Sequence, residues 1–300
     1  MKLCSLFCLA AVGWTQTAPS LPSPLARLEA GIQRATRSVN ATWGIYIKCL
    51  ETNEEIALNA DQQMDTMSVI KIPLMAEAFR QAGAGKFALT DRVTLMEAAK
   101  RPGTGTIQWL DPGVQLTIKD LLTYMIIVSD NTATDLIYDR VGGPAPVNQL
   151  MANWGLSSIR ATGTAEAWFQ ALRAAPSAEV FHQQAKNPFG LSTPRDMGRL
   201  LERMERGEAV SQNASEQMLQ IMRRQVYSSR LPRYVAGFRI AHKTGDFLPY
   251  IANDVGILES TSRRVVISVF TARHFGNGFA LEDAIGRIAE MTASYFAVRQ

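Results

Sequence analysis

Cysteine and histidine are both scarce in this chain of 300 residues, which holds three of each. The histidines are His182, His242 and His274. They lack the short spacings of metal ligands and have no cysteine partners, so the sequence predicts no metal site. No other cofactor is implied.

Long apolar runs are also missing, except at the N-terminus. There Lys2 precedes twelve apolar or small residues, Leu3–Trp14, and a polar stretch follows. This pattern predicts a signal peptide over residues 1–18 and a secreted or periplasmic protein. The alternative is an N-terminal membrane anchor, but a bilayer takes about 20 residues. No later stretch predicts a membrane span.

Loss of that segment would also leave a single cysteine. Cys4 and Cys8 lie within it, so only Cys49 would remain and no internal disulfide could form. Cys49 lies in an alternating, strand-like run. This pattern predicts a core residue and not a nucleophile.

Blocks of basic residues with interleaved aromatics are missing too. The formal net charge is +4, or +3 without Lys2. Basic residues mostly mix with acidic ones, as they do over residues 195–206. We therefore expect a solvated surface and no nucleic-acid partner.

Phosphate loops and repeats are not found either. Gly103-Thr104-Gly105 and Gly142-Gly143 neither follow a strand nor carry the Lys-Ser/Thr of a phosphate loop, so they are interpreted as turns. No fixed-period repeat or heptad run is present, which excludes solenoids and coiled coils.

The elements that the sequence does predict form two lobes. Residues 24–62 and 209–300 carry a helix and hairpin at the start, and three strands and a helix at the end. We expect them to form one α/β lobe, an antiparallel sheet flanked by helices, with an all-α lobe over residues 63–208 inserted between them. The cleft between the lobes is the expected binding site. The predicted elements of the first lobe are a helix from Ser23–Pro24, strands Trp43–Leu50, Ile56–Asn59, Phe238–Lys243, Asp254–Leu258 and Val265–Thr271, and a helix Phe279–Phe296.

The inserted segment has helical patterns with clear start and stop signals. Its predicted helices are Met67–Arg80, one from a capping box at Thr117–Asp120 toward Val128, Thr132–Val141 ended by Gly142–Gly143, and one opened by Ser192-Thr193-Pro194 and ended by Gly207.

A first chemical motif, Ser68-Val69-Ile70-Lys71, lies at the start of an apolar helix. A spacing of three puts Ser68 and Lys71 on one helix face. A desolvated lysine can act as base toward the serine hydroxyl, and the helix N-terminus favours developing negative charge. The motif alone is weak, since Ser-x-x-Lys arises by chance about once in such a chain.

A second motif, Ser129-Asp130-Asn131, separates two predicted helices. Ser129 can pass a proton to a leaving group, and the Asn131 amide can bond a substrate carbonyl. The competing interpretation is that Asp130 or Asn131 only caps the next helix.

A third motif, Lys243-Thr244-Gly245, is expected at the end of a strand. The lysine and the hydroxyl can hold a carboxylate, and glycine allows a substrate backbone to approach closely. Taken alone, the triplet could be a simple turn.

The three motifs occur in the order found in serine enzymes that recognise penicillin. From about residue 24 to the C-terminus the sequence resembles the class A β-lactamase family. The spacings, 61 residues from Ser68 to Ser129 and 114 from Ser129 to Lys243, are similar to that family's.

This resemblance implies a role for each motif. Ser68 would be the acylated nucleophile, Lys71 its base, and Ser129 and Asn131 the proton path and amide contact. Lys243 and Thr244 would bind the substrate carboxylate, beside Gly245. The backbone N–H groups of Ser68 and Asp246 would form the oxyanion hole.

The sequence departs from the family in the loop between the predicted helices, where the stretch from Arg173 to Lys186 also differs from the family's usual loop. Members of the family have a Glu followed four residues later by Asn, and this pair positions the deacylating water. Here Glu166 and Gln170 keep the spacing, but their neighbours differ. Glu166 is therefore a candidate base and Gln170 a candidate second contact, against a solvated acid as the alternative.

Three functions remain open. The first is hydrolysis of β-lactams through a Ser68 acyl-enzyme. The second is a D-alanyl-D-alanine peptidase, which needs no such glutamate, and the third is a penicillin-binding sensor or inert binding module. The expected partner is a small β-lactam or a D-Ala-D-Ala peptide.

Overall fold

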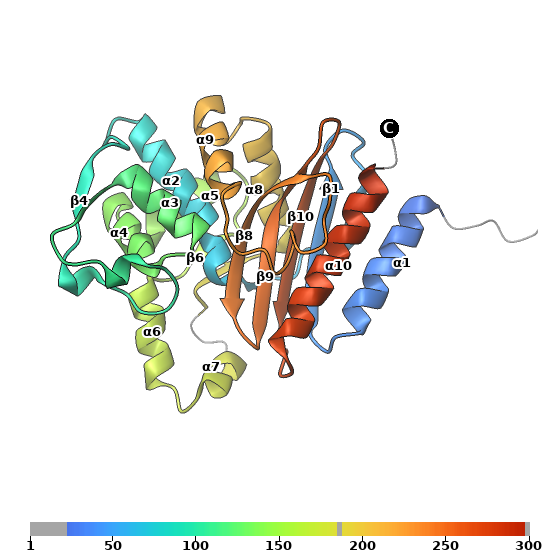
Figure 1. The fold of residues 1–300 in the computed structure, drawn as a ribbon. Helices are drawn as coiled ribbons and strands as arrows, with labels where there is room; N and C mark the ends of the chain where they lie inside the picture. Colours follow the sequence, from blue (N-terminus) through green and yellow to red (C-terminus); the bar gives the residue numbers. More distant parts are fainter. Residues whose placement is uncertain (1–22, 185–187, 298–300) are drawn as a thin grey trace, which may run out of the picture.

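The computed structural model describes residues 23–184 and 188–297 (Figure 1), so the predicted signal peptide lies outside the described residues. The two ends of the chain meet in a five-stranded antiparallel sheet of order β2-β1-β10-β9-β8. This confirms the predicted α/β fold with an antiparallel sheet. The strands are β1 (Thr42–Cys49), β2 (Glu55–Leu58), β8 (Arg239–Phe247), β9 (Ile251–Glu259) and β10 (Arg264–Ala272).

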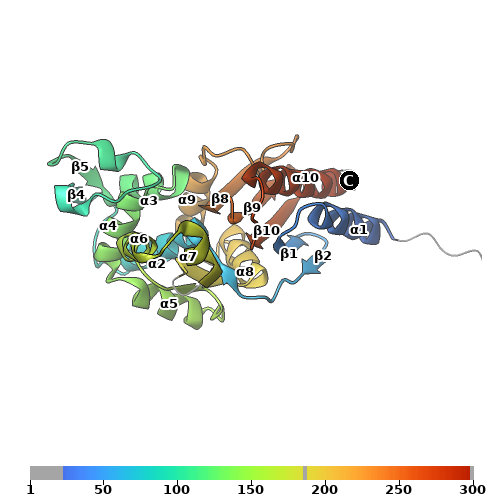
Figure 2. The ribbon, with the colours of Figure 1, turned by 90° about the horizontal axis from the view of Figure 1, so that it is seen from below.

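Helices cover both faces of this sheet. The terminal helices α1 (Pro24–Arg37) and α10 (Gly278–Ala297) lie side by side on one face (Figures 1 and 2). Helix α8 (Pro194–Glu205) packs against β1 and β10 from the other face. Because it is covered on both sides, every residue of the inner strand β9 is buried.

The remaining helices lie between β2 and β8 in the chain. Two of the predicted signals are seen there: Thr117 and Asp120 form a capping box, and Gly142 ends a helix with φ of 91°. These helices are α2 (Lys71–Gly83), α3 (Ile118–Ile127), α4 (Asn131–Val141), α5 (Pro144–Asn153), α6 (Ala165–Ala174), α7 (Ala178–Gln184) and α9 (Gln212–Met222).

Short elements complete the chain. The 3-10 helix η1 (Met67–Ile70) precedes α2. The others are η2 (Glu97–Ala99), η3 (Ile107–Trp109), the pair β4 (Arg92–Thr94) and β5 (Gln115–Thr117), and the three-stranded sheet of β3 (Met64–Asp65), β7 (Gly190–Ser192) and β6 (Arg160–Ala161).

Three local expectations were wrong. Ser68 lies in η1 and not in a continuous helix from Met67. The triplet at Lys243 lies inside β8, which pairs with β9 as far as Phe247. The expected loop around Glu166 is instead the helix α6. These errors share a cause, because each element is set by packing against a distant part of the chain.

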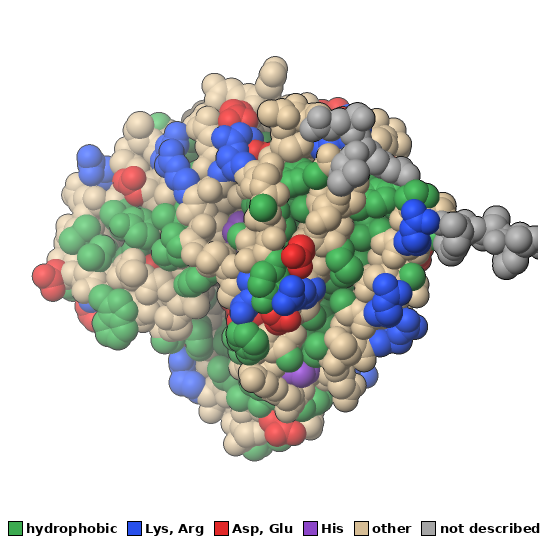
Figure 3. Space-filling model, turned by 45° about the vertical axis from the view of Figure 1, so that its right-hand side comes forward, with side chains coloured by type: hydrophobic (Ala, Val, Ile, Leu, Met, Phe, Trp, Pro, Cys, Tyr) green, Lys and Arg blue, Asp and Glu red, His purple; other side chains and the backbone are tan. Residues whose placement is uncertain are grey.

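Cys49 is fully buried in the core, as expected. In Figure 3, which faces the side of α10 and α1, charged side chains lie in small groups of both signs. In residues 23–184 and 188–297, no helix is long and apolar enough to cross a membrane.

Candidate active site

The backbone that carries Ser68 makes an unusual turn. Met67, directly before it, has φ of 45°, a left-handed conformation that is uncommon for a residue with a side chain. Its N–H donates to Oδ1 of Asp65 at 2.8 Å, which holds the turn in place. Ser68 is half-buried and lines a cavity of about 280 Å³.

Lys71 lies one turn along, fully buried. Its Nζ donates to the Ser129 carbonyl at 2.7 Å, to Ser129 Oγ at 3.1 Å and to Asn131 Oδ1 at 2.9 Å. The structure therefore brings the first two motifs together. Within the described residues Lys71 makes these bonds and none to Ser68.

Lys243 approaches the same hydroxyl from the sheet. Its Nζ donates to Ser129 Oγ at 3.0 Å and to the Thr244 carbonyl at 2.8 Å. With two amines donating to its oxygen, Ser129 has its own proton available for a third group. Ser129 is thus placed to pass a proton into the cavity that it lines.

Burial changes the charge of both amines. It is the largest cause that lowers the pKa of Lys71 far below its ordinary value, and the neighbouring charge of Lys243 adds to the effect. The pKa of Lys243 falls to about 7, again mainly through burial and against the attraction of Asp246 and Asp254. An uncharged Lys71 has two protons for its three polar contacts and a lone pair that can accept a proton near neutral pH.

Asp130 has the capping role that was the competing interpretation of its motif. Its carboxylate accepts the N–H of Ala133 at 2.8 Å, in the first turn of α4, and those of Thr106 and Ile107 at 2.6 and 2.8 Å. A Cβ on Gly105 would collide with Asp130, so this turn needs glycine. The predicted turn glycines therefore pack against the second motif.

The same turn also contributes to the site. Thr104 Oγ1 donates to the Ser129 carbonyl at 2.7 Å, and Thr104 lines the cavity with Ser68. Asn131 Nδ2 donates to the Pro102 carbonyl at 3.0 Å. Sequence reasoning missed Thr104, since nothing local sets this threonine apart.

Thr244 and Gly245 continue β8 past Lys243. Thr244 Oγ1 is buried and has no hydrogen-bond partner among the described residues, which leaves it free for a ligand. A Cβ on Gly245 would collide with the Thr66 carbonyl and lie 3.1 Å from Ser68 N. Glycine thus lets β8 lie against the turn of the nucleophile.

The carboxylate of Asp246 is held by a buried arginine that the sequence did not single out. Arg230 pairs with Asp246 and, at 3.1 Å, with Glu282, and donates to the Asn253 carbonyl at 2.8 Å. Asp246 lines the Ser68 cavity. Arg230 lies in a segment without a regular pattern, so only the fold reveals its partners.

Helix α6 supplies an apolar wall. Trp168, Phe169 and Leu172, all on one face of α6, line the cavity with Phe247. Trp168 and Phe247 meet edge to face, 5.2 Å between ring centroids. This wall favours a substrate with an apolar group near the reacting carbonyl.

Glu166 and Gln170 lie on another face of α6. Gln170 Nε2 donates to Glu166 Oε1 at 2.9 Å, and Glu166 forms ion pairs with Arg173 at 3.1 Å and Arg101 at 3.6 Å. The spacing of four that singled them out is one helical turn. The structure does not bring either residue to Ser68, and neither lines its cavity.

Another acid organises this region. Asp135 accepts the N–H groups of Ala165 and Glu166 at 2.7 and 3.0 Å, at the start of α6. It also accepts Nε of Arg101 at 2.8 Å. Asp135 therefore fixes α6 on α4, and with it the apolar wall.

Serine, lysine, serine and lysine around one cavity define a serine acyl-transfer enzyme, and comparison with known proteins gives the same class. The model of the Beta-lactamase enzyme family matches residues 27–296. The chain belongs to this family. It is a hydrolase of the serine β-lactamase type.

Individual relatives support this assignment. A β-lactamase from Sphaerobacter thermophilus DSM 20745 is 31% identical, with a TM-score of 0.79 over 92% of this chain and 98% of that one. A mutant of PBP-A, solved as an acyl-enzyme complex with penicillin G, is 29% identical, with a TM-score of 0.77 over 92% of this chain and 99% of that one. β-Lactamase VEB-1 of Pseudomonas aeruginosa is 23% identical over 282 residues, 88% of this chain and 89% of that protein.

Proposed function

We propose that the protein opens β-lactam rings by a class A-like route, through an acyl-enzyme on Ser68. The observation that carries this proposal is the hydrogen-bonded set of Lys71, Ser129 and Lys243 beside the Ser68 cavity. It provides a base, a proton path and a cation for a substrate carboxylate.

In the acylation step, uncharged Lys71 takes the proton of Ser68 as Oγ attacks the lactam carbonyl. The proton then passes through Ser129 to the ring nitrogen as the C–N bond breaks. Lys71 ends the step uncharged, and the ring-opened acyl group stays bound to Ser68 through an ester.

Binding of the substrate carboxylate is assigned to β8. Protonated Lys243 supplies the charge and Thr244 a hydroxyl without another partner. The N–H groups of Ser68 and Asp246 would stabilise the oxyanion, and the position of Gly245 against Ser68 N supports this arrangement.

Release of the acyl group needs a water and a base. Glu166 is ion-paired on another face of α6, so we assign the base to Lys71, which is uncharged again after acylation. It would take a proton from the water as the water attacks the ester. As the ester C–O bond breaks, Ser68 Oγ leaves and takes the proton from Lys71, so the ring-opened acid departs and both Ser68 and uncharged Lys71 are restored.

The assignment is tested by mass spectrometry of the intact protein after a penicillin pulse. We expect a covalent adduct on Ser68 that Ser68→Ala removes, while the exposed control Ser262→Ala keeps it. An adduct that persists in Ser68→Ala would contradict the assignment.

One observation favours a second candidate, a D-alanyl-D-alanine peptidase. The α6 wall facing the cavity is apolar, and none of the α6 residues that line the cavity carries a carboxylate. A peptide's amine leaves after acylation and opens a path for water, whereas the ring amine of a β-lactam stays tethered to the acyl group. An adduct lasting hours, together with release of D-alanine from a short peptide, would favour the peptidase; an adduct lost in seconds would favour the β-lactamase.

A further inference from the structure

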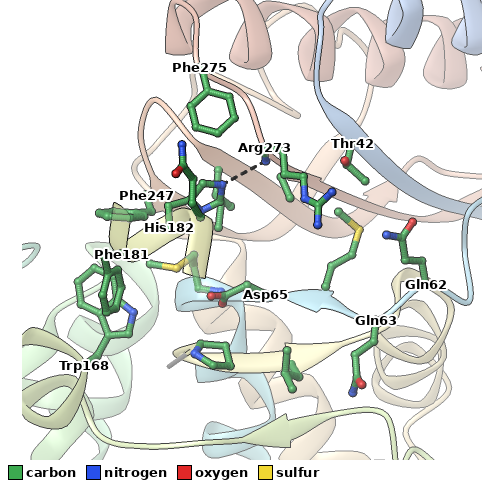
Figure 4. A pocket seen from close by; sticks show the side chains of 17 residues that line it. Thr42, Gln62, Gln63, Asp65, Trp168, Phe181, His182, Phe247, Arg273 and Phe275 are labelled. Carbon is green, nitrogen blue, oxygen red and sulfur yellow. Dashed lines mark hydrogen bonds between the residues drawn. The ribbon is translucent and has the colours of Figure 1, made fainter. Parts of the chain in front are cut away.

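A second and larger cavity lies on the other side of the nucleophile turn. Its volume is about 630 Å³ (Figure 4). Met67, Trp168 and Phe247 line both this cavity and that of Ser68. Nothing in the acylation chemistry uses the second cavity, although it shares these three side chains with the cavity of the reacting serine.

The inner part of this cavity holds a half-buried acid without a countercharge among the described residues. Asp65 lines the cavity and accepts the N–H of Met67 at 2.8 Å. No Lys, Arg or His among the described residues forms an ion pair with it. Burial raises the pKa of Asp65 to about 7, against hydrogen bonds from the backbone of Met67, Phe189 and Gly190. A carboxyl in this state gains most from a cation brought by a ligand.

A basic group lines the same space. Arg273 follows β10 and lies above Asp65 in the view of Figure 4. It has no ion pair within the described parts of the chain. His182, the other titratable lining group, is held uncharged: its Nε2 accepts the Arg273 N–H at 3.3 Å, and burial lowers its pKa. The guanidinium of Arg273 is therefore available to an anion.

Aromatic and apolar side chains make up most of the remaining wall. Phe181 and Phe247 meet edge to face at 6.0 Å between ring centroids, and Phe275 stands at the rim, half exposed. Such walls contact the methylene groups of a ligand and leave charge recognition to a few polar groups.

We propose that this second cavity binds an amino-acid group, whose ammonium pairs with Asp65 and whose carboxylate pairs with Arg273. The group would be the far end of the substrate's acyl side chain, reaching over Met67 and Phe247 from the ester on Ser68. This proposal rests on the proposed function, since it names a substrate class for the same serine. A free amino acid carries the same two charged groups, and the experiments below distinguish it from the acyl side chain of a substrate.

The test compares three cephalosporins that share the same nucleus and differ only in the acyl side chain. Cephalosporin C carries an amino and a carboxyl group at the end of its acyl chain. Glutaryl-7-aminocephalosporanic acid carries the carboxyl alone, and cephalothin carries neither. The rates are measured at about pH 8, where the carboxyl of Asp65 is mostly ionised. We expect the second-order rate constant of Ser68 acylation to be about tenfold higher for cephalosporin C than for the glutaryl compound.

Two variants assign the two charges. Asp65→Asn keeps an oxygen for the Met67 N–H, and it should erase the preference of cephalosporin C over the glutaryl compound. Arg273→Gln should slow both of these relative to cephalothin. The exposed control variants Asp111→Asn and Arg224→Gln should leave every ratio unchanged. Equal rates for all three compounds in the native protein, or ratios unaffected by Asp65→Asn, would contradict binding of the acyl side chain in the second cavity.

A binding measurement covers the free ligand and does not depend on acylation. D-α-Aminoadipate, in excess, is added to the Ser68→Ala protein and the thermal midpoint is recorded. A rise that Asp65→Asn and Arg273→Gln abolish supports the amino-acid site, even where no cephalosporin reacts and the proposed function fails. A cephalosporin C preference without this rise assigns the site to the acyl chain alone. If cephalosporin C shows no preference and D-α-aminoadipate causes no rise in the thermal midpoint, the proposal is refuted.

Discussion

At the residue scale, two buried amines share one hydroxyl. Each costs free energy when charged, and together they repel, so the site favours one proton fewer than two free lysines would carry. The substrate carboxylate would restore the charge of Lys243, while Lys71 stays uncharged. Neither amine could work in this way if it were exposed to water.

This arrangement predicts a pH profile. The pKa of Lys243 is about 7 and depressed, so its charge is present below this pH and lost above it. For acylation by a penicillin, kcat/KM, which reports the free enzyme, should fall as pH rises through about 7, by about tenfold or more. Stopped-flow acylation across this range measures it.

Two controls separate this effect from others. Lys243→Arg keeps its charge at high pH, so its profile should not fall there, whatever its absolute rate. A penicillin methyl ester, which has no carboxylate, should show no fall with the native protein. An equal fall for acid and ester would contradict the role of Lys243.

At the scale of elements, α6 has two faces with different roles. Trp168, Phe169 and Leu172 face the cavity, while Glu166 is a third exposed and paired with arginines. Exposed ion pairs contribute little to stability, about 0.2–1 kcal/mol. The helix therefore acts on the site through its apolar face.

It follows that Glu166→Gln should leave the lifetime of the Ser68 adduct within about twofold of the native value and lower the free energy of unfolding by less than about 1 kcal/mol. Timed mass spectra and urea unfolding measure the two. An adduct trapped by this substitution would mean that Glu166 reaches the ester and is the base after all.

A second feature at the scale of elements is the close packing of β8 against η1 at Gly245. A methyl group on Gly245 would collide with the backbone of Thr66, so Gly245→Ala must push the strand away from Ser68. Overpacking of this kind costs about 1–3 kcal/mol. We expect lower stability and slower acylation together. Gly163→Ala is the matched control, because its new methyl would meet no atom closer than 3.7 Å.

At the scale of the whole molecule, Arg230 joins parts distant in the sequence. It binds Asp246 at the site and Glu282 on α10, and it also contacts the backbone of β9. It is 3% exposed, and its charge is kept by these partners and by the nearby carboxylate of Asp254. Position of the active-site strand and stability of the terminal helix are coupled through this one side chain.

Arg230→Leu should therefore lower the free energy of unfolding by about 3–5 kcal/mol, because it leaves carboxylates without their cation. Urea unfolding measures it, with the exposed Arg224→Leu as control. Arg230→Lys, which keeps a charge, should recover part of the loss. A loss below about 1 kcal/mol would show that the carboxylates find other partners.

The sequence by itself determined the fold class, the strands of the five-stranded sheet, six of the described α-helices, and the three motifs at Ser68, Ser129 and Lys243. Caps, glycine stops and alternating strands are local signals, read from residues a few positions apart. The order and spacing of the motifs added the family resemblance. That part of the site could be predicted because each motif is contiguous.

Only the tertiary structure decided what the side chains face. The Glu166–Gln170 spacing fits both a water-binding pair and one turn of a helix. The contacts of Asp135 with the start of α6 stabilise the helix and direct both side chains away from Ser68. Likewise Asp65 and Arg273 are 208 positions apart, and Arg230 and Asp246 belong to no common pattern. Such pairs depend on long-range folding, where burial and distance set the chemistry, and no local signal reports either.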